Sequence, residues 1–308
     1  MWKLLELRHL KEITPFVSSA LDRGLLCYNY EALKYLSNYK NQCLFKIEDD
    51  VLYLGRHSKI INTKYFKLYF SPIHIGGDED KEKEALIRSL REGLSAWVGL
   101  EEAKRYKVDY RKVSEFRGGV QVNYHRPEGF SGNKNKNIRW EINRFNKALE
   151  NNELEVVVDY PLERLSHLND TWNVQKGGVC KLFGYAIKHR SSIDHLKNLT
   201  LLKDNKPITS SLYRCYTDHT WLCVGAISDY DKIPFGGLQR MSDIHIFNLM
   251  PDLQNLVVGG YKDDPLKKSK LRGGSYSLYC NVTCPSTVKM TTDMWSSFRP
   301  KKETYFEV

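Results

Sequence analysis

The sequence predicts an α/β fold with a mixed sheet, built as two similar halves that a basic helix joins. The first observation is the pattern of residues 219–284, which runs strand, Gly-rich turn, helix, strand, basic turn and strand. The second is that each half carries a Gly-Gly pair between a strand and a helix, at 76–77 and at 236–237. In open α/β sheets such a turn lies at the carboxyl edge of the strand, where phosphate-bearing ligands bind.

The first half runs to about Gly118 and alternates helices with strands. Asp78 opens an amphipathic helix directly after Gly76-Gly77, and the acidic residues of its first turn suit the positive end of the helix dipole. Apolar periodicity places the other helices at 13–25 and 28–39, and the strands at 42–47, 51–56, 65–75 and 104–110.

Residues 111–135 are polar and rich in turn-forming residues, so we expect a mobile connection or a substrate loop there. An amphipathic helix follows at 134–149, and the face opposite its apolar stripe is almost entirely basic. That face is either the ordinary solvated side of a helix or a surface that grips a phosphate backbone and stacks a base. In the second case the nucleic-acid-binding residues are Lys134, Lys136, Arg139, Trp140, Arg144 and Lys147.

The second half repeats the plan of the first. Residues 219–226 and 255–260 form buried strands on either side of a helix at 238–250, and a cationic turn then ends at Gly273-Gly274. The earlier elements are strands at 155–159, 199–203 and 208–216 and helical stretches at 161–172 and 191–196. The repeated plan predicts domains at 1–118 and 151–308, with a loop and the basic helix at 119–150 between them.

The composition is that of a globular protein, with 41% hydrophobic and 27% charged residues in a chain of 308. No apolar run is long enough to span a membrane, and residues 1–8 do not read as a signal peptide, so we expect a cytoplasmic protein. Seven cysteines, an odd number, indicate a reduced chain. Cys280 and Cys284 lack a second ligand pair at zinc spacing, so we expect no metal. The net charge of +10 indicates either a basic surface or a polyanionic partner.

Four short stretches resemble a known family, at 26–33, 70–76, 136–145 and 259–274. Together with the repeated order of hairpin, strand, Gly-rich turn, helix and strand, they are similar to tandem GNAT-fold N-acyltransferases. The resemblance is to Fem-type peptidyltransferases and to the C-terminal domain of phosphatidylglycerol lysyltransferases. It implies two GNAT-like domains and the transfer of an acyl or aminoacyl group. The acyl-CoA signature Gln/Arg-x-x-Gly-x-Gly/Ala is absent at 233–237, so the donor is either aminoacyl-tRNA or acyl-CoA.

Acyl transfer to an amine needs a polarised carbonyl, a stabilised oxyanion and a deprotonated amine. The resemblance assigns the oxyanion to strand backbone N–H groups and to Lys270, for which a solvated helix-end lysine is the alternative. The catalytic base would come from Asp229, Tyr230 or Asp231, whose two close carboxylates are expected to raise each other's pKa unless they simply form a turn. The cofactor-binding residues would be Trp221, Val224, Gly236, Gly237, Lys267, Lys268 and Arg272.

Three functions stay open at this point. The first is an N-acyltransferase that moves an acyl or aminoacyl group from aminoacyl-tRNA or an acyl thioester to an amine, with its active site in the second half. The second is a transferase whose acceptor is a modified base in DNA or RNA. The third is a non-catalytic nucleic-acid-binding module on the same fold. Nucleic acid is therefore an expected partner, as a tRNA donor or as an acceptor.

Overall fold

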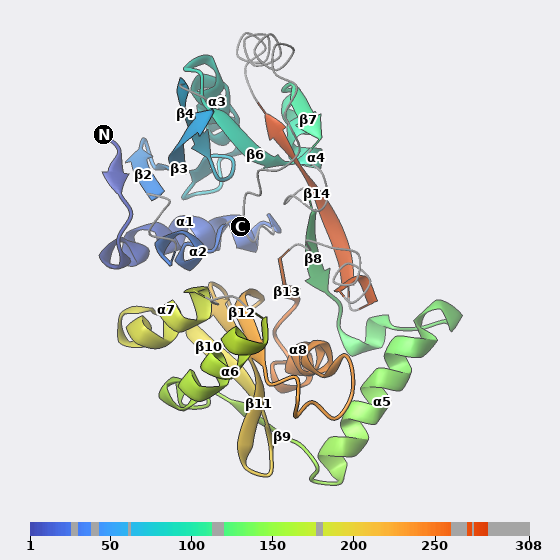
Figure 1. Ribbon diagram of the computed structural model, residues 1–308. Helices are drawn as coiled ribbons and strands as arrows, with labels where there is room; N and C mark the ends of the chain where they lie inside the picture. The colour runs from blue at the N-terminus through green and yellow to red at the C-terminus, as the bar shows by residue number, and fades with distance from the viewer. Residues whose placement is uncertain are drawn as a thin grey trace, which may run out of the picture.

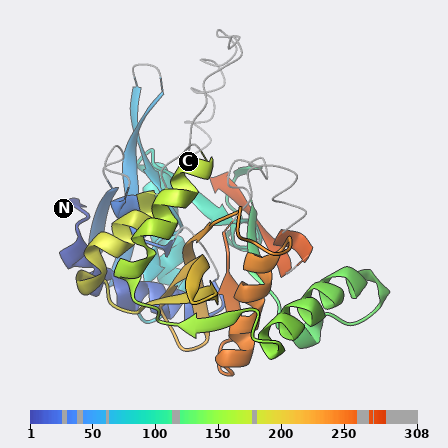
Figure 2. The same cartoon turned by 60° about the horizontal axis from the view of Figure 1, so that its bottom comes forward.

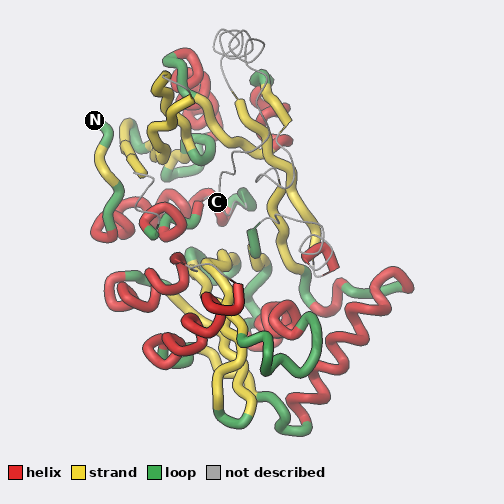
Figure 3. The backbone as a smooth tube through the Cα atoms, in the orientation of Figure 1, coloured by secondary structure: helices red, strands yellow, loops and turns green. Residues whose placement is uncertain are grey.

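The structure is a computed structural model that describes residues 1–25, 30–37, 43–60, 63–112, 120–176, 181–259, 270–272 and 274–282. The described strands form one mixed sheet of 14 strands, and helices cover both of its faces (Figures 1 and 3). The predicted α/β class with a mixed sheet is therefore confirmed.

The first half contains a layer of helices and a group of strands, two of which are parallel neighbours (Figure 1). Its helices are η1 (Leu7–His9), α1 (Leu10–Asp22), α2 (Leu33–Leu36), α3 (Glu79–Arg91) and α4 (Leu100–Tyr106). Its strands are β1 (Lys3–Leu4), β2 (Cys43–Glu48), β3 (Val51–Ile60), β4 (Thr63–Leu68), β5 (Ile73–His74), β6 (Ser95–Gly99) and β7 (Tyr110–Lys112).

The second half begins at β8 and repeats this plan with longer strands. Its helices are η4 (Pro127–Gly129), η5 (Asn133–Asn135), α5 (Lys136–Glu150), η6 (Leu162–Leu165), α6 (Ser166–Lys176), α7 (Lys181–His189), η7 (Arg190–Ser192) and α8 (Leu238–Leu249). Its strands are β8 (Val120–Tyr124), β9 (Glu155–Val158), β10 (Leu196–Lys203), β11 (Lys206–Cys215), β12 (Thr220–Ser228), β13 (Asn255–Val257) and β14 (Gly274–Val282).

The repeat predicted from the two Gly-Gly pairs is present in the structure. In the first half β4 and β6 are parallel and α3 connects them, and in the second half β12 and β13 are parallel and α8 connects them. Each connecting helix begins directly after its Gly-Gly pair. The predicted two-fold plan of the chain is thus confirmed.

One strand of the second half, β14, joins the sheets of the two halves into one. The order is β1-β2-β3-β4-β6-β14-β8-β13-β12-β11-β10-β9, with β5 on β3 and β7 on β14. β14, close to the end of the described chain, pairs with β6 of the first half, while β8 pairs with β13 of the second (Figure 1). The domain boundaries predicted at 1–118, 119–150 and 151–308 stay a proposal, and the paired strands cross them.

Three apolar cores hold the layers together. One core lies between α3, α4 and the first-half sheet, and a second lies between α5, α8 and the second-half sheet. The largest is shared, because it contains side chains of α1 and α2 from the first half and of α6, α7, β11 and β12 from the second. Each sheet is therefore covered on both faces, and one face of each half contributes to the common core.

Two predictions of local structure in the first half are wrong. The stretch 104–110 was expected as a strand, but α4 extends to Tyr106, and β7 begins only at Tyr110. A helix forms here because Leu100, Ala103 and Tyr106 recur every three residues and are all buried on one side. The single strand predicted at 65–75 is divided, because β4 ends at Leu68 and the short β5 pairs with β3 instead.

Further differences concern the predicted connections. The stretch 111–135 contains β8, in which Val122 and Tyr124 are buried, so it is not simply a polar loop. The helical stretch predicted at 191–196 is a short 3-10 turn, and α7 lies just before it. Of the helix predicted at 28–39, α2 covers only Leu33–Leu36, and residues 28, 29, 38 and 39 lie outside the described part of the chain.

Candidate active site

The sheet of the second half opens between β12 and β13. The two strands pair only from Thr220 with Asn255 to Leu222 with Val257, although β12 continues to Ser228. Directly after the last pair, β12 carries a β-bulge at Val224, because Leu212 of β11 pairs with Gly225 while Tyr213 pairs with Cys223. A bulge bends its strand and re-aims the backbone groups next to it, and bulges are frequent beside active sites. Two of the predicted cofactor-binding residues lie here, since Trp221 is buried at the last parallel pairs and Val224 forms the bulge.

A carboxylate lies beneath this opening. Asp243 extends from α8 toward β11, where its Oδ1 accepts hydrogen bonds from Ser211 Oγ at 2.5 Å and from Tyr213 Oη at 2.6 Å. The Asp243 side chain is buried, and burial raises its pKa to about 6, against the opposing effect of these hydrogen bonds and of the cations Lys270 and Arg240. A carboxylate with such a pKa can accept a proton near neutral pH.

Lys270 points into the same region. Its Nζ donates a hydrogen bond to the carbonyl of Val258, one residue beyond the end of β13. Burial lowers the pKa of Lys270, while Cys223 of β12 and Asp243 of α8 act in the opposite direction. The ammonium is therefore bonded to the backbone and only partly exposed, an arrangement that differs from a fully solvated lysine at a helix end.

The turn before α8 is open to an external anion. Gly237 is the N-cap with φ of +80°, and no described side chain caps the first N–H groups of the helix. The equivalent turn of the first half is filled by its own side chains. There Asp78 Oδ1 accepts from the N–H groups of Asp80 and Lys81, at 3.1 Å each, and His74 Nδ1 accepts from those of Gly76 and Asp78, at 3.1 and 3.2 Å. Among the described residues, no side chain caps the second-half turn, and uncapped N–H groups at a helix start can bind a phosphate.

Two arginines lie beside this turn. Arg240 and Arg272 both donate to Glu141 of α5, Arg272 at 3.2 Å, and the Arg272 side chain is about half exposed. Gly237 leaves room for Arg240, because a Cβ there would lie 2.8 Å from Arg240 Nη2, whereas a Cβ at Gly236 would have no described atom within 4 Å. The predicted phosphate ligands Lys267 and Lys268 lie outside the described residues.

The predicted bases at 229–231 form a turn that is held by hydrogen bonds from one side chain. Gln175 of α6 donates to Asp229 at 3.1 Å and to Asp231 at 3.0 Å, and its carbonyl accepts from the N–H of Tyr230. The expectation that the two carboxylates raise each other's pKa is wrong for Asp229. Although burial pushes its pKa upward, hydrogen bonds from Lys232 and Gln175 hold it below the ordinary value.

Part of the basic face predicted on α5 is present in the structure. Lys136, Trp140, Arg144 and Lys147 are exposed and recur at helical spacing along one side, and Trp140 is 60% exposed. The Arg144 guanidinium lies over the ring of Phe235 at 4.3 Å, next to the Gly-Gly turn. Arg139 is instead bound to the carbonyls of Phe130 and Gly132, and the side chain of Lys134 is outside the described residues. Figure 2 shows α5 projecting from the body of the molecule.

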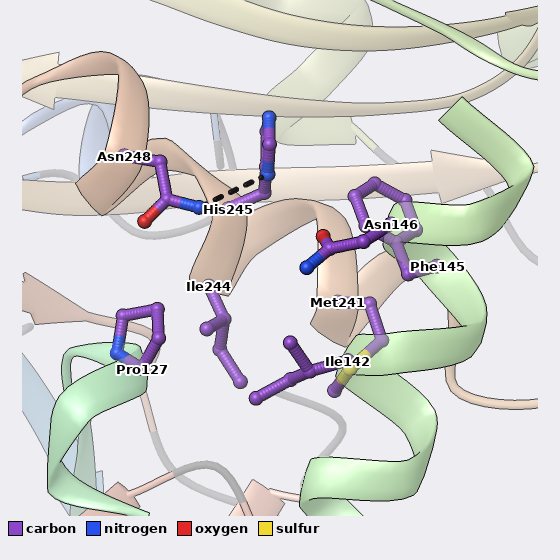
Figure 4. A pocket seen from close by; sticks show the side chains of 8 residues that line it. All are labelled: Pro127, Ile142, Phe145, Asn146, Met241, Ile244, His245 and Asn248. Atoms are coloured by element: carbon purple, nitrogen blue, oxygen red, sulfur yellow. Dashed lines mark hydrogen bonds between the residues drawn. The ribbon is translucent and has the colours of Figure 1, made fainter. Parts of the chain in front are cut away.

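A crevice between α5 and α8 is lined by apolar side chains that point toward one another (Figure 4). Its lining residues are Pro127, Ile142, Phe145, Asn146, Met241, Ile244, His245 and Asn248. The polar contact within it joins His245 Nδ1 and Asn248 Nδ2 at 3.4 Å, and burial lowers the pKa of His245. None of the residues predicted from the sequence lines this crevice, so it belongs to the packing of the two helices.

Solved structures share this arrangement. A conserved protein of unknown function from Bacteroides thetaiotaomicron superposes with a TM-score of 0.66 at 14% identity, covering 91% of this chain and 98% of that one. The C-terminal domain of a putative lysylphosphatidylglycerol synthetase from Agrobacterium fabrum gives 0.56 at 12% identity, covering 90% and 95%. L-PGS from Bacillus licheniformis gives 0.56 at 13% identity, covering 83% and 88%.

The chain shares the fold of these proteins, and the predicted resemblance to the C-terminal domain of phosphatidylglycerol lysyltransferases is confirmed at the level of fold. At these low identities the likeness is one of fold, and neither the protein-family models nor the curated protein sequences contain a significant match to the chain. Among the described residues no helix is both long and apolar enough to cross a membrane, and no group of three or more His, Cys, Asp or Glu could hold a metal ion.

Three residues of the candidate site were missed from the sequence, namely Asp243, Ser211 and Tyr213. The available signal was a single carboxylate among the apolar residues of Met241–Phe247, a stretch that also contains Ser242 and His245, and it gave no partner. Its partners lie 30 and 32 residues earlier in the chain, on another element. Only the packing of α8 against β11 brings the three together.

Proposed function

We propose that the protein is an acyl- or aminoacyltransferase with its active site in the opening between β12 and β13. The observation that carries this proposal is that the buried carboxylate of Asp243 and the ammonium of Lys270 lie near enough to influence each other's pKa where the two strands separate. A carboxylate is costly to bury, so its presence beside an opened sheet favours a chemical role. The shared fold supports the same reaction class.

In the proposed reaction an acceptor amine attacks the donor carbonyl, forming a C–N bond as the donor's ester or thioester bond breaks. Lys270 would stabilise the negative charge that develops on the carbonyl oxygen, and backbone N–H groups near the Val224 bulge would add to it. Asp243 would accept a proton from the acceptor's ammonium, directly or through Tyr213, and so produce the neutral amine that attacks. A second proton leaves the nitrogen and neutralises the departing thiolate or alkoxide. In this proposal Asp229, Tyr230 and Asp231 are not the catalytic base, and they only fix the conformation of the chain after β12.

The donor's phosphates would bind at the open turn before α8, where Gly237 and Arg272 lie. Of the two predicted donors, aminoacyl-tRNA is favoured over acyl-CoA. The exposed stripe of Lys136, Trp140, Arg144 and Lys147 begins beside the same turn and suits an extended polyanion. One structural neighbour is named a putative lysylphosphatidylglycerol synthetase, which also supports aminoacyl transfer.

The test is a transfer assay on the full chain with two radiolabelled donors, a pool of aminoacyl-tRNAs and acetyl-CoA. Acceptors are a mixture of small amines, duplex DNA and RNA. We expect label to move from aminoacyl-tRNA to a small amine, with binding that weakens as salt rises. Transfer to nucleic acid instead would favour base modification, the second function. Salt-dependent binding of nucleic acid without any transfer would overturn the proposal in favour of the non-catalytic module. A cytoplasmic location stays a prediction.

A further inference from the structure

Two cations and two aromatic side chains share one face of the first-half sheet. Arg56 of β3 lies directly opposite Lys67 of β4, and Lys67 lies beside Ser95 of β6. Side chains that neighbour each other across a sheet point to the same face, as do residues two apart along a strand. Trp97, two residues beyond Ser95, and Tyr69, two residues beyond Lys67, therefore belong to the same face. The Lys67 ammonium lies 4.3 Å from the centre of the Trp97 ring.

The two cations lack a compensating acid. Among the described residues no carboxylate lies within ion-pair distance of Arg56 or Lys67, and like charges directly opposite each other on a sheet are destabilising. Burial, together with the neighbouring Arg56, lowers the pKa of Lys67 to about 7. An arrangement that costs stability in the free protein becomes favourable when an anion lies between the two cations.

Part of the hydrogen-bonding capacity of this face is also unused, although Arg56 forms a side-chain hydrogen bond with Tyr69. Arg56 Nε and Trp97 Nε1 are buried N–H donors with no hydrogen-bond partner within the part of the chain that the structure describes. Native proteins leave few buried donors unpaired, and a missing ion is one of the recognised reasons. The four side chains are themselves only partly buried, so part of each is exposed to solvent.

The face is directed toward the second half. Tyr69 packs against the apolar core that both halves share, and this core includes Val224, the bulge residue of β12. The phosphates of the donor are already accommodated at the turn before α8, which lies on the opposite side of the second-half sheet, against α5. A ligand on the Arg56 face would therefore approach the opening from the side that the donor leaves free.

We propose that Arg56, Lys67 and Trp97 bind an anionic group of the acceptor substrate, a phosphate or a carboxylate. The assignment to the acceptor depends on the proposed transferase function, whereas the anion site itself depends only on the first-half geometry. The guanidinium would hold two oxygens of the anion, the ammonium would neutralise its charge, and the indole N–H would complete the set of donors. The acceptor is then an amine that also carries a negative charge.

The probes are inorganic phosphate and acetate, titrated by calorimetry at low ionic strength into the full chain. The test variant is Lys67→Met, and the matched control is Lys46→Met, because Lys46 also lies over aromatic rings but on the other face of the sheet. We expect at least one probe to bind wild type and Lys46→Met equally, and Lys67→Met at least tenfold more weakly. Trp97→Phe, which keeps a ring and removes the N–H, should weaken binding severalfold. The probe that binds more tightly identifies the group as phosphate or carboxylate.

A second readout follows Lys67 itself by NMR after reductive methylation of the lysines with ¹³C-formaldehyde. We expect its titration midpoint to rise by about one unit when the bound probe saturates, because an adjacent anion favours the charged ammonium. Unchanged binding by Lys67→Met, or a Lys67 midpoint that ignores both probes, would overturn the anion site. If transfer activity persists in that case, the proposed transferase function is kept and only the anion site is rejected. If the site binds anions but no donor is used, only its assignment to the acceptor fails.

Discussion

Replacing Asp243 with asparagine should change how stability depends on pH. The substitution keeps the shape of the side chain and an oxygen that can accept from Ser211 and Tyr213, but it removes the titratable group. In the folded protein the pKa of Asp243 is raised from an ordinary 3.8 to about 6. Between these two values the folded state holds a proton that the unfolded state has released, so stability falls as pH rises through this window.

The magnitude follows from the size of that shift. The displacement from 3.8 to about 6 spans about two units, and each unit corresponds to about 1.4 kcal/mol. Asp243 should therefore make the protein about 3 kcal/mol less stable above pH 7 than below pH 4. Asp243→Asn should remove this contribution, so its stability relative to wild type should increase with pH and level off near neutrality.

The assay is urea unfolding of both proteins at half-unit steps from pH 4 to pH 8. The quantity of interest is the difference in free energy of unfolding between them, because groups other than Asp243 cancel in it. A constant offset from the altered hydrogen bonds does not affect the slope. A difference that stays flat across this range would refute the claim that a carboxylate is buried beneath the opening.

The remaining predictions concern the two Gly-Gly turns. Gly237→Ala should cost about 2 kcal/mol in urea unfolding, because its φ is +80° and the new Cβ would displace Arg240. Gly132→Ala is the control, because Gly132 has a φ of +78° and a new Cβ there would have no described atom within 4 Å, so it measures the backbone cost alone. An equal loss of stability in both variants would refute the predicted contact between the new Cβ and Arg240. Arg23→Met should cost about 3 kcal/mol, because it leaves the buried carboxylate of Glu82 without its cation. Removing an exposed cation in Lys104→Met should cost about 0.5 kcal/mol or less, and a similar loss there would contradict the account.

The elements of the second half could be predicted because their signals are local. An uninterrupted apolar strand, a Gly-Gly pair and a helix that ends before Pro251 occupy consecutive stretches of chain. The same reasoning failed at α4, where seven residues offer only two turns of periodicity and the stretch also fits a strand. The pairing of β14 with the first half was beyond this approach, because the register between β14 and β6 is decided by packing and not by adjacent residues.

The candidate site was predicted in its position but not in its members. Lys270 and the Gly236-Gly237 turn were identified because a lysine in a cationic run and paired glycines are conspicuous in a sequence. Asp243 was not, because an isolated acid in a helix is usually solvated and its burial depends on the path of β11. Lys67 was missed for the same reason, since alternating residues of a strand normally place lysine in water.

Transfer of label by Lys270→Met tests the central claim most directly. The assay uses the donor that wild type accepts, and Lys188→Met, an exposed lysine of α7, serves as the matched control. Loss of a cation that stabilises the oxyanion should slow transfer by about 100-fold at saturating donor while donor binding changes little. Lys188→Met should match wild type. Transfer by Lys270→Met at the wild-type rate would contradict the placement of the chemistry between β12 and β13.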